Sequence, residues 1–198
     1  MRIGIFGGTF DPPHIGHLIL ASEALDQMQL DSLLWVLTPN PPHKLGQVIT
    51  DAPVRTAMVK AMISRFPEFE FSDLEFQRPG PHYAVDTVRE FHRVYPEAQL
   101  FYLLGGDSLN DLPVWHDPSG FVKQCDGIIV MQREGEEPDW KSLDQKLPDL
   151  RAKAYMLRTP LIEISSRGIR ERIKHDHSWR QFVNAEVEKL IKDHHLYQ

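Results

Sequence analysis

The chain has 198 residues, of which 41% are hydrophobic and 25% are charged, and its formal net charge is −6. These values are typical of a globular domain with a substantial core, and the negative charge disfavours a broad nucleic-acid surface. No apolar stretch approaches the length of a membrane span, and Cys125, the one cysteine, is expected to be a small buried hydrophobe that forms no internal disulfide. We therefore expect a single cytoplasmic domain (1–198) without a signal peptide or a membrane contact.

The chain begins with a pattern typical of a strand that leads into a helix. Residues 2–6 form a short apolar run, as in a strand buried on both faces, and Gly7 and Gly8 then allow a tight turn. Asp11 is expected to cap a helix with two prolines in its first turn, because apolar residues recur at helical spacing over residues 15–25.

Two histidines stand at the start of that helix. His14 and His17 are three residues apart, so both side chains project from one face of the first turn. The N-terminus of a helix has unpaired backbone N–H groups and the positive end of the dipole, which together favour an anion. The loop lacks the Walker lysine and the three-glycine dinucleotide pattern, so it predicts a phosphate site of another kind.

Further along the chain, strand-like and helix-like segments alternate. This pattern predicts an α/β fold of the Rossmann-like, doubly wound kind, with a mostly parallel sheet, helices on both faces and a C-terminal helical segment (165–198). Ligands of such sheets bind beyond the carboxyl ends of the strands. Residues 133–146 are polar and are expected to form a surface excursion. The expected strands are 32–38, 69–74, 99–104, 127–131 and 154–157, and the expected helices are 53–66, 83–95 and two in 165–198 with a break near 175–178.

Four other segments carry groups that suit a phosphorylated substrate. Ser165 ends a strand-like run and can cap a helix that contains Arg170, which would give a second anion site. Residues 38–44 form a proline-rich loop with a basic pair, which in isolation would be an ordinary surface turn. Asp107 follows a central strand and suits either ribose hydroxyls or a helix cap. Trp115 lies in a loop, where core packing and ligand stacking are both open.

The motif His14-Ile15-Gly16-His17 resembles the signature of the nucleotidyltransferase superfamily. The longer string GGTFDPPHIGHL, residues 7–18, resembles that of bacterial nicotinate-nucleotide adenylyltransferases. Residues 164–170 resemble an element of that family that grips the ATP phosphates, although Arg167 stands where the family usually has threonine. Ala84 likewise replaces a family threonine whose contact with nicotinate is made by the backbone.

The resemblance implies transfer of an adenylyl group from ATP to nicotinate mononucleotide, with His17 as the principal transition-state donor and His14 beside it. Mg²⁺ would arrive with ATP, and no metal site built by the protein is implied. The expected ATP-binding residues are Gly7, Gly8, Thr9, Phe10, His14, His17, Gly105, Asp107, Ile164, Ser165 and Arg170. The expected mononucleotide-binding residues are Asn40, His43, Lys44, Ala84, Trp115 and His116.

Two alternatives stay open at this stage. The first is a related adenylyl- or cytidylyltransferase with another phosphorylated acceptor, such as phosphopantetheine. The second is a nucleotide-binding module without catalytic activity. The sequence also leaves open a homo-oligomer, because it shows no heptad repeat and no large apolar stripe.

Overall fold

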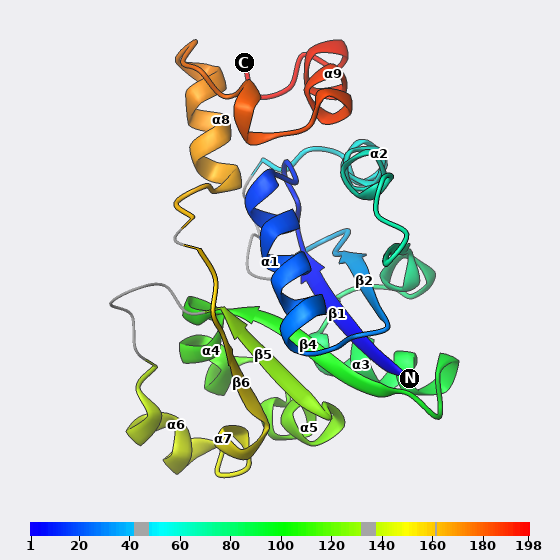
Figure 1. Ribbon diagram of the computed structural model, residues 1–198, viewed down its shortest axis with the longest axis vertical. Coiled ribbons are helices and arrows are strands. Elements are labelled where there is room, and N and C mark those ends of the chain that lie inside the picture. The colour runs from blue at the N-terminus through cyan, green and yellow to red at the C-terminus, as the bar shows by residue number, and fades with distance from the viewer. Residues whose placement is uncertain (42–47, 132–137, 161) are drawn as a thin grey trace.

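The computed structural model describes residues 1–41, 48–131, 138–160 and 162–198, and within them six parallel strands form one sheet (Figure 1). The order across the sheet is β3-β2-β1-β4-β5-β6. Every neighbouring pair is parallel, so each connection crosses a face of the sheet. The strands are β1 (Arg2–Gly8), β2 (Ser32–Leu37), β3 (Phe69–Ser72), β4 (Gln99–Gly105), β5 (Gly127–Met131) and β6 (Ala154–Leu157).

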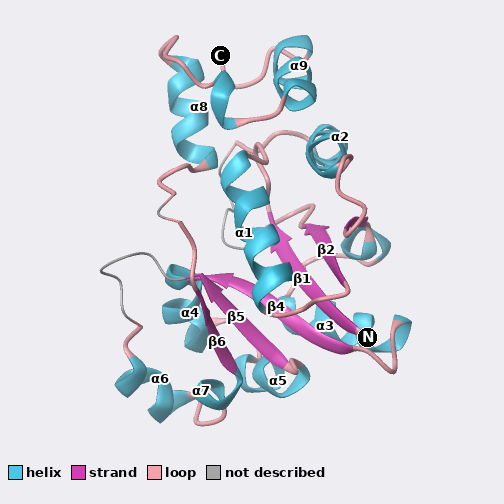
Figure 2. Cartoon of the chain, in the orientation of Figure 1, coloured by secondary structure: helices cyan, strands magenta, loops and turns pink. Residues whose placement is uncertain are grey.

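Helices cover both faces of the sheet, which gives three layers (Figure 2). The helices α1 and α2 pack on one face, and α3 and α5 pack on the other, because alternate strand residues point to opposite sides. In β2, for example, Trp35 belongs to the first core and Leu34 to the second. The helices are α1 (Ile15–Gln27), α2 (Ala52–Ile63), α3 (Ala84–Val94), α4 (Gly106–Asp111), α5 (Pro118–Gln124), α6 (Trp140–Lys146), α7 (Leu150–Lys153), α8 (Ser166–Lys174) and α9 (Ala185–Asp193).

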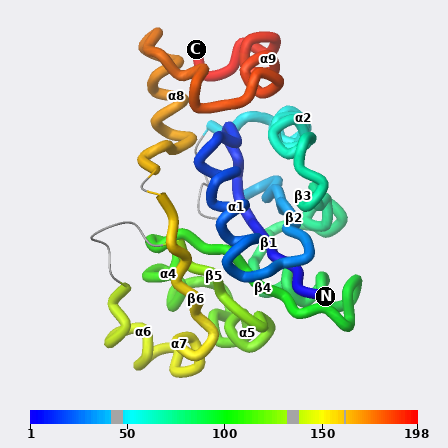
Figure 3. Tube along the Cα trace, viewed as in Figure 1, coloured from blue at the N-terminus to red at the C-terminus, as the bar shows by residue number. Residues whose placement is uncertain are grey.

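The position of the ligand site follows from the strand order. The chain winds outward from β1 in one direction and from β4 in the other, so the loops after these two central strands diverge and leave a crevice between them. Figure 3 shows α8 and α9 together at the end of the molecule toward which β1 runs. The last two helices therefore lie beyond the carboxyl ends of the central strands.

The predicted fold class is confirmed, and the differences lie at element ends and in short helices. The tight turn expected at Gly7 and Gly8 is wrong, because both glycines continue β1 and pair with β2. The strand expected at 69–74 ends at Ser72, because a short 3-10 helix (Leu74–Gln77) follows it. The expected excursion at 133–146 contains α6, whose Leu143 is buried, while residues 132–137 lie outside the described part. The pattern also gave no signal for α4, α5 and α7, which are too short for a clear period. In the described part of the chain, no helix combines the length and apolar character needed to cross a membrane.

Candidate active site

The two histidines of the first motif are held together at the start of α1. His14 is the N-cap residue, and its backbone N–H donates a hydrogen bond to His17 Nδ1 over 3.1 Å. The two rings stack with centroids 3.6 Å apart and planes inclined by 26°. Because Nδ1 of His17 accepts a hydrogen bond, the proton of the neutral ring must be on Nε2, which makes that atom a donor.

Gly16 separates the two histidines for a steric reason. A Cβ atom at this position would lie 3.0 Å from His14 Nδ1 and 3.3 Å from a methyl group of Ile162. Any larger residue would therefore force the His14 ring to shift by a few tenths of an ångström. The His-Ile-Gly-His spacing thus fixes both the face on which the rings lie and the room between them.

His14 is an uncharged donor at neutral pH. The residue is 4% exposed, and burial lowers its pKa to about 4, because the protonated ring would lose its hydration. Its buried Nδ1 has no hydrogen-bond partner in the described structure. His14 can therefore serve an anion through a ring N–H group, without adding a fixed positive charge.

The loop between β1 and α1, residues 9–14, is anchored through its carbonyl groups. Arg170 Nη1 donates to the Asp11 carbonyl over 2.7 Å, and Ser166 Oγ donates to the Pro12 carbonyl over 2.8 Å. Both donors come from the start of α8, so the N-termini of α1 and α8 lie side by side, as Figure 1 shows. These carbonyl lone pairs are occupied by donors and do not repel an incoming phosphate.

Asp11 does not cap α1, contrary to the sequence prediction. The helix begins four residues later, at Ile15, after an extended His14. The buried Asp11 carboxylate instead accepts hydrogen bonds from the Tyr197 hydroxyl over 2.6 Å and from the Thr50 N–H over 3.3 Å. A long-range partner therefore replaces the local cap.

Arg55 joins two loops of the site and was missed by the sequence analysis. It is 1% exposed and donates to four backbone carbonyls, those of Thr50 (2.6 Å), Thr9 (3.0 Å), Thr38 (3.0 Å) and Pro39 (2.7 Å). Burial lowers its pKa, while the carboxylates of Asp11 and Asp51 raise it. A signal was present in the sequence, because Arg55 belongs to the otherwise apolar stripe of α2, which contains Met58, Val59, Met62 and Ile63.

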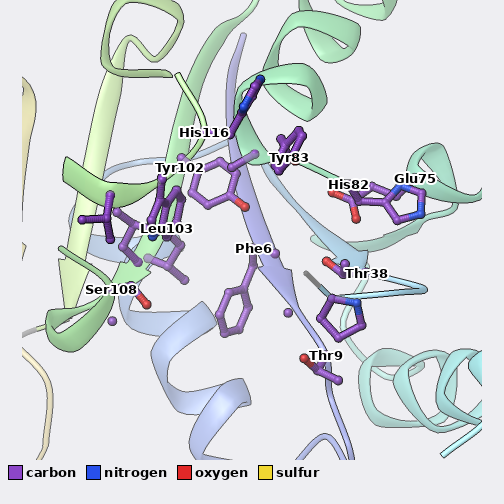
Figure 4. A pocket seen from close by; sticks show the side chains of 18 residues that line it. Phe6, Thr9, Thr38, Glu75, His82, Tyr83, Tyr102, Leu103, Ser108 and His116 are labelled. Atoms are coloured by element: carbon purple, nitrogen blue, oxygen red, sulfur yellow. The ribbon is translucent and has the colours of Figure 1, made fainter. Parts of the chain in front are cut away.

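A cavity of about 650 Å³ lies at the carboxyl ends of β1 and β4 (Figure 4). Thr9 is at one end of the cavity and Tyr83 and His116 are at the other, with Thr38 along one side. The cavity brings together seven of the predicted binding residues, which come from four separate segments of the chain. These are Gly7, Gly8, Thr9, Ala84, Gly105, Trp115 and His116.

The other predicted residues that the structure describes do not line the cavity. Among them are His14, His17 and Arg170, which lie at the adjoining starts of α1 and α8. Phe10 is 3% exposed and packs edge-on against His17, so its side chain supports the histidine and its backbone alone is left to meet a ligand. Asp107 is exposed in the first turn of α4. Ser165 caps α8, where its Oγ accepts from Gly168 N–H over 3.1 Å. Asn40 is exposed and Ile164 half-buried, and neither lines the cavity, while His43 and Lys44 lie outside the described residues.

Aromatic rings surround the end of the cavity far from Thr9. His116 stacks on Tyr83 with centroids 4.0 Å apart, and Trp115 packs against Phe121 at 5.5 Å. The backbone at Tyr83 starts α3, and no side chain caps that helix end. This end therefore offers a flat apolar surface beside helix N–H groups that lack an intrahelical partner.

A buried polar cluster supports the same end and was also missed by the sequence analysis. Glu75 is 3% exposed and accepts a hydrogen bond from Thr87 Oγ1 over 2.6 Å. Arg78 lies 3.7 Å from Glu75 and also donates to Thr87 Oγ1, over 2.6 Å. Burial raises the pKa of Glu75, because ionisation would cost hydration. Glu75 and Thr87 are twelve residues apart, a distance at which sequence spacing gives no signal.

The sheet order, the two adjoining helix N-termini and the stacked histidines define a nucleotide-binding α/β protein of the nucleotidyltransferase class. A family model described as Cytidylyltransferase-like matches residues 5–172. A probable nicotinate-nucleotide adenylyltransferase from Dehalococcoides mccartyi is 39% identical over 199 residues, which cover 100% of this chain and 97% of that protein. A probable nicotinate-nucleotide adenylyltransferase from Thermomicrobium roseum is 39% identical over 197 residues, which cover 100% of this chain and 92% of that protein. The chain therefore belongs to the cytidylyltransferase-like family and, within it, to the family of nicotinate-nucleotide adenylyltransferases.

The fold has a solved counterpart as well. The Plasmodium falciparum nicotinic acid mononucleotide adenylyltransferase complexed with NaAD superposes with a TM-score of 0.81, covering 99% of this chain and 97% of that one. The two sequences are 19% identical, so this likeness concerns the fold alone.

Proposed function

We propose that this protein transfers the adenylyl group of ATP to nicotinate mononucleotide, forming nicotinate adenine dinucleotide and releasing pyrophosphate. The observation that carries the proposal is that one cavity extends from Thr9, at the start of the loop between β1 and α1, to the aromatic end at Trp115. We call this loop, residues 9–14, the phosphate loop. An adenylyl donor and an acceptor with an aromatic ring can meet in such a cavity, because one end suits phosphate groups and the other suits a pyridine ring.

The chemistry requires alignment and charge stabilisation, and it needs no covalent intermediate. The phosphate of the mononucleotide is the nucleophile, and it attacks the α-phosphorus of ATP as pyrophosphate leaves from the opposite side. His17 donates its Nε2 proton in a hydrogen bond to the phosphate oxygens, where negative charge develops. The neutral His14 ring lies against it and contributes a second donor.

The start of α8 is assigned to the ATP phosphates. Ser165 caps this helix, and Arg170 uses Nη1 to hold the Asp11 carbonyl, which leaves other N–H groups of the guanidinium for phosphate oxygens. Gly7 and Gly8 are assigned to the nucleotide as well. A Cβ at Gly7 would overlap the Tyr102 hydroxyl, so a larger residue there would displace a side chain that lines the cavity.

We infer that Mg²⁺ enters with ATP, where it neutralises charge on the departing phosphates. The groups around the phosphate loop include histidine, arginine, serine and backbone N–H donors, which bind phosphate oxygens. The carboxylate of the loop, Asp11, is buried and accepts from Tyr197 and Thr50, so the metal is left to oxygens of ATP and water. Among the described residues, no group of three or more His, Cys, Asp or Glu side chains could hold a metal ion.

The acceptor is assigned to the aromatic end of the cavity. Trp115 offers a stacking face for a pyridine ring, and the backbone N–H groups of Ala84 and His116 are the donors for its carboxylate. Asn40, His43 and Lys44 are assigned to the mononucleotide from the resemblance. We infer that the protein acts in the cytoplasm on these two small molecules, without a nucleic acid or a membrane.

The test is to mix the protein with Mg·ATP and nicotinate mononucleotide and to measure pyrophosphate together with the dinucleotide by chromatography. Parallel reactions contain CTP in place of ATP, and phosphopantetheine or nicotinamide mononucleotide as the acceptor. Turnover with phosphopantetheine and none with either mononucleotide would replace the proposal by the related transferase. Binding of ATP without release of pyrophosphate in any mixture would identify a nucleotide-binding module.

A further inference from the structure

The peptide unit between Tyr83 and Ala84 carries a charged donor on its carbonyl side. Arg78 Nη2 lies 3.2 Å from the Tyr83 carbonyl oxygen and donates to it. The N–H group of the same peptide unit belongs to Ala84, the first residue of α3, and Ala84 lines the cavity. One amide therefore connects a guanidinium behind the cavity wall with the aromatic end of the cavity.

A positive donor on a carbonyl group polarises the whole amide. Electron density moves toward the oxygen, so the N–H group on the other side becomes a stronger donor. The N-terminus of α3 acts in the same sense, because its dipole places positive charge at Ala84. The Arg78 side chain is 19% exposed, so water screens its charge less than that of a surface arginine.

The groups around Arg78 do not cancel this charge fully. Glu75 is 3.7 Å away, and its carboxylate is shared with the Thr87 hydroxyl, which donates to it over 2.6 Å. Asp86 is 3.6 Å away with 37% of its side chain exposed, so water also solvates it. His82, which lines the cavity, has its pKa lowered by burial and by the nearby positive charge of Arg78.

Tyr83 is held in place by the same cluster. Thr87 Oγ1 lies within hydrogen-bonding distance of Glu75, Arg78 and the Tyr83 carbonyl, at 2.6, 2.6 and 3.2 Å. Arg78 thus fixes the direction of the peptide as well as its polarity. A stronger N–H donor at a fixed position favours a negatively charged acceptor group over a neutral one.

We propose that Arg78 is a specificity-determining positioning residue, which acts through the Tyr83–Ala84 peptide to favour a carboxylate over a carboxamide on the pyridine ring of the acceptor. This inference rests on the proposed adenylyl transfer to a pyridine mononucleotide and names a residue that sets its acid preference. Arg78 acts without touching the substrate, so its effect should be confined to the choice between acceptors.

The experiment compares kcat/KM for nicotinate and nicotinamide mononucleotides in the unmodified protein and in Arg78→Gln. We expect the ratio of acid to amide to fall roughly tenfold, mostly through loss of the acid activity, because a charge-assisted contact is replaced by a neutral one. The KM for ATP should change less than about twofold, since Arg78 lies at the far end of the cavity from the phosphate loop. Arg78→Lys, which keeps the charge, should retain a ratio closer to that of the unmodified protein.

Arg89→Gln is the matched control, because Arg89 is also on the α3 side of the cavity and also pairs with Asp86, at 3.1 Å. Its partners are two carboxylates at the surface, so its loss should leave the ratio unchanged. If Arg78→Gln alone does not fold, Arg78→Gln combined with Glu75→Gln removes both charges of the cluster and permits the same measurement.

Each outcome has a clear meaning. An unchanged ratio in a folded Arg78 variant, or an equal fall in Arg89→Gln, would overturn the inference and leave adenylyl transfer in place. Equal use of both mononucleotides by the unmodified protein would also overturn it, since there would be no preference to explain. Lack of turnover with either mononucleotide would instead refute the proposed function.

Discussion

Arg55→Met is expected to destabilise the protein strongly, because the buried Arg55 satisfies four carbonyl groups. A hydrogen bond from a charged donor contributes about 1.5–3 kcal/mol, which for four bonds gives an upper limit of about 6–12 kcal/mol. Desolvation of the guanidinium offsets part of this sum, and removal of one partner from a buried charged contact typically costs about 3–5 kcal/mol. We therefore expect a loss of about 4 kcal/mol in the free energy of unfolding.

Arg55→Lys should lower the free energy of unfolding by less, about 2 kcal/mol. An ammonium group keeps the charge but cannot span four acceptors as a planar guanidinium does. Both variants should raise the KM for each substrate, since Arg55 holds the Thr9 carbonyl in the phosphate loop and the Thr38 carbonyl beside the cavity. The measurements are urea unfolding, with stability taken from the midpoint at constant slope, and steady-state kinetics.

The control is Arg65→Met, which removes an arginine whose side chain is 78% exposed in its pair with Glu186. Such a pair is worth about 0–1 kcal/mol, so this variant should resemble the unmodified protein. The reasoning would be refuted if Arg55→Met lost less than about 1 kcal/mol with both KM values unchanged. Arg55 would then be buried without holding the two loops.

Three further predictions concern the phosphate site. His17→Ala should lower kcat by roughly 10²–10³-fold with little change in the KM for ATP, and a near-normal kcat with a greatly raised KM would make His17 a simple binding residue. Arg170→Ala should raise the KM for ATP roughly tenfold to a hundredfold, whereas Arg167→Thr, at an exposed position, should leave the kinetics largely intact. If Arg167→Thr raised the KM for ATP as much as Arg170→Ala, the phosphate contact would belong to Arg167. The free energy of unfolding should be greatest above pH 6.5 and should fall as the pH drops toward 4. His14 accounts for at most about 3 kcal/mol of this fall, because its ring is protonated at a higher pH in the unfolded chain than in the folded protein. The same pH dependence of the urea midpoint in His14→Gln would contradict this.

Local features of the sequence determined the fold class and the first motif. A strand that includes Gly7 and Gly8, a loop and a helix follow one another within the first 27 residues. The apolar period encodes the strand and the helix, whereas the turn residues misled, because the two glycines extend the strand. The alternation of such units is enough to predict a parallel sheet, and the three-residue spacing of His14 and His17 is enough to place them on one face. Short-range geometry of this kind depends on residue type and spacing along the chain, and not on contacts with distant segments.

Tertiary structure alone decided which partners the buried polar groups find. Asp11 is a good helix cap by type, yet it binds Tyr197, which is 186 residues away, because the cap position belongs to His14 after two prolines. Arg78 stands behind the peptide of Ala84 for a similar reason, since a 3-10 turn and the start of α3 meet at the edge of the cavity. Periodicity specifies which face of an element is buried, but the packing of whole elements decides which distant donor meets which acceptor there.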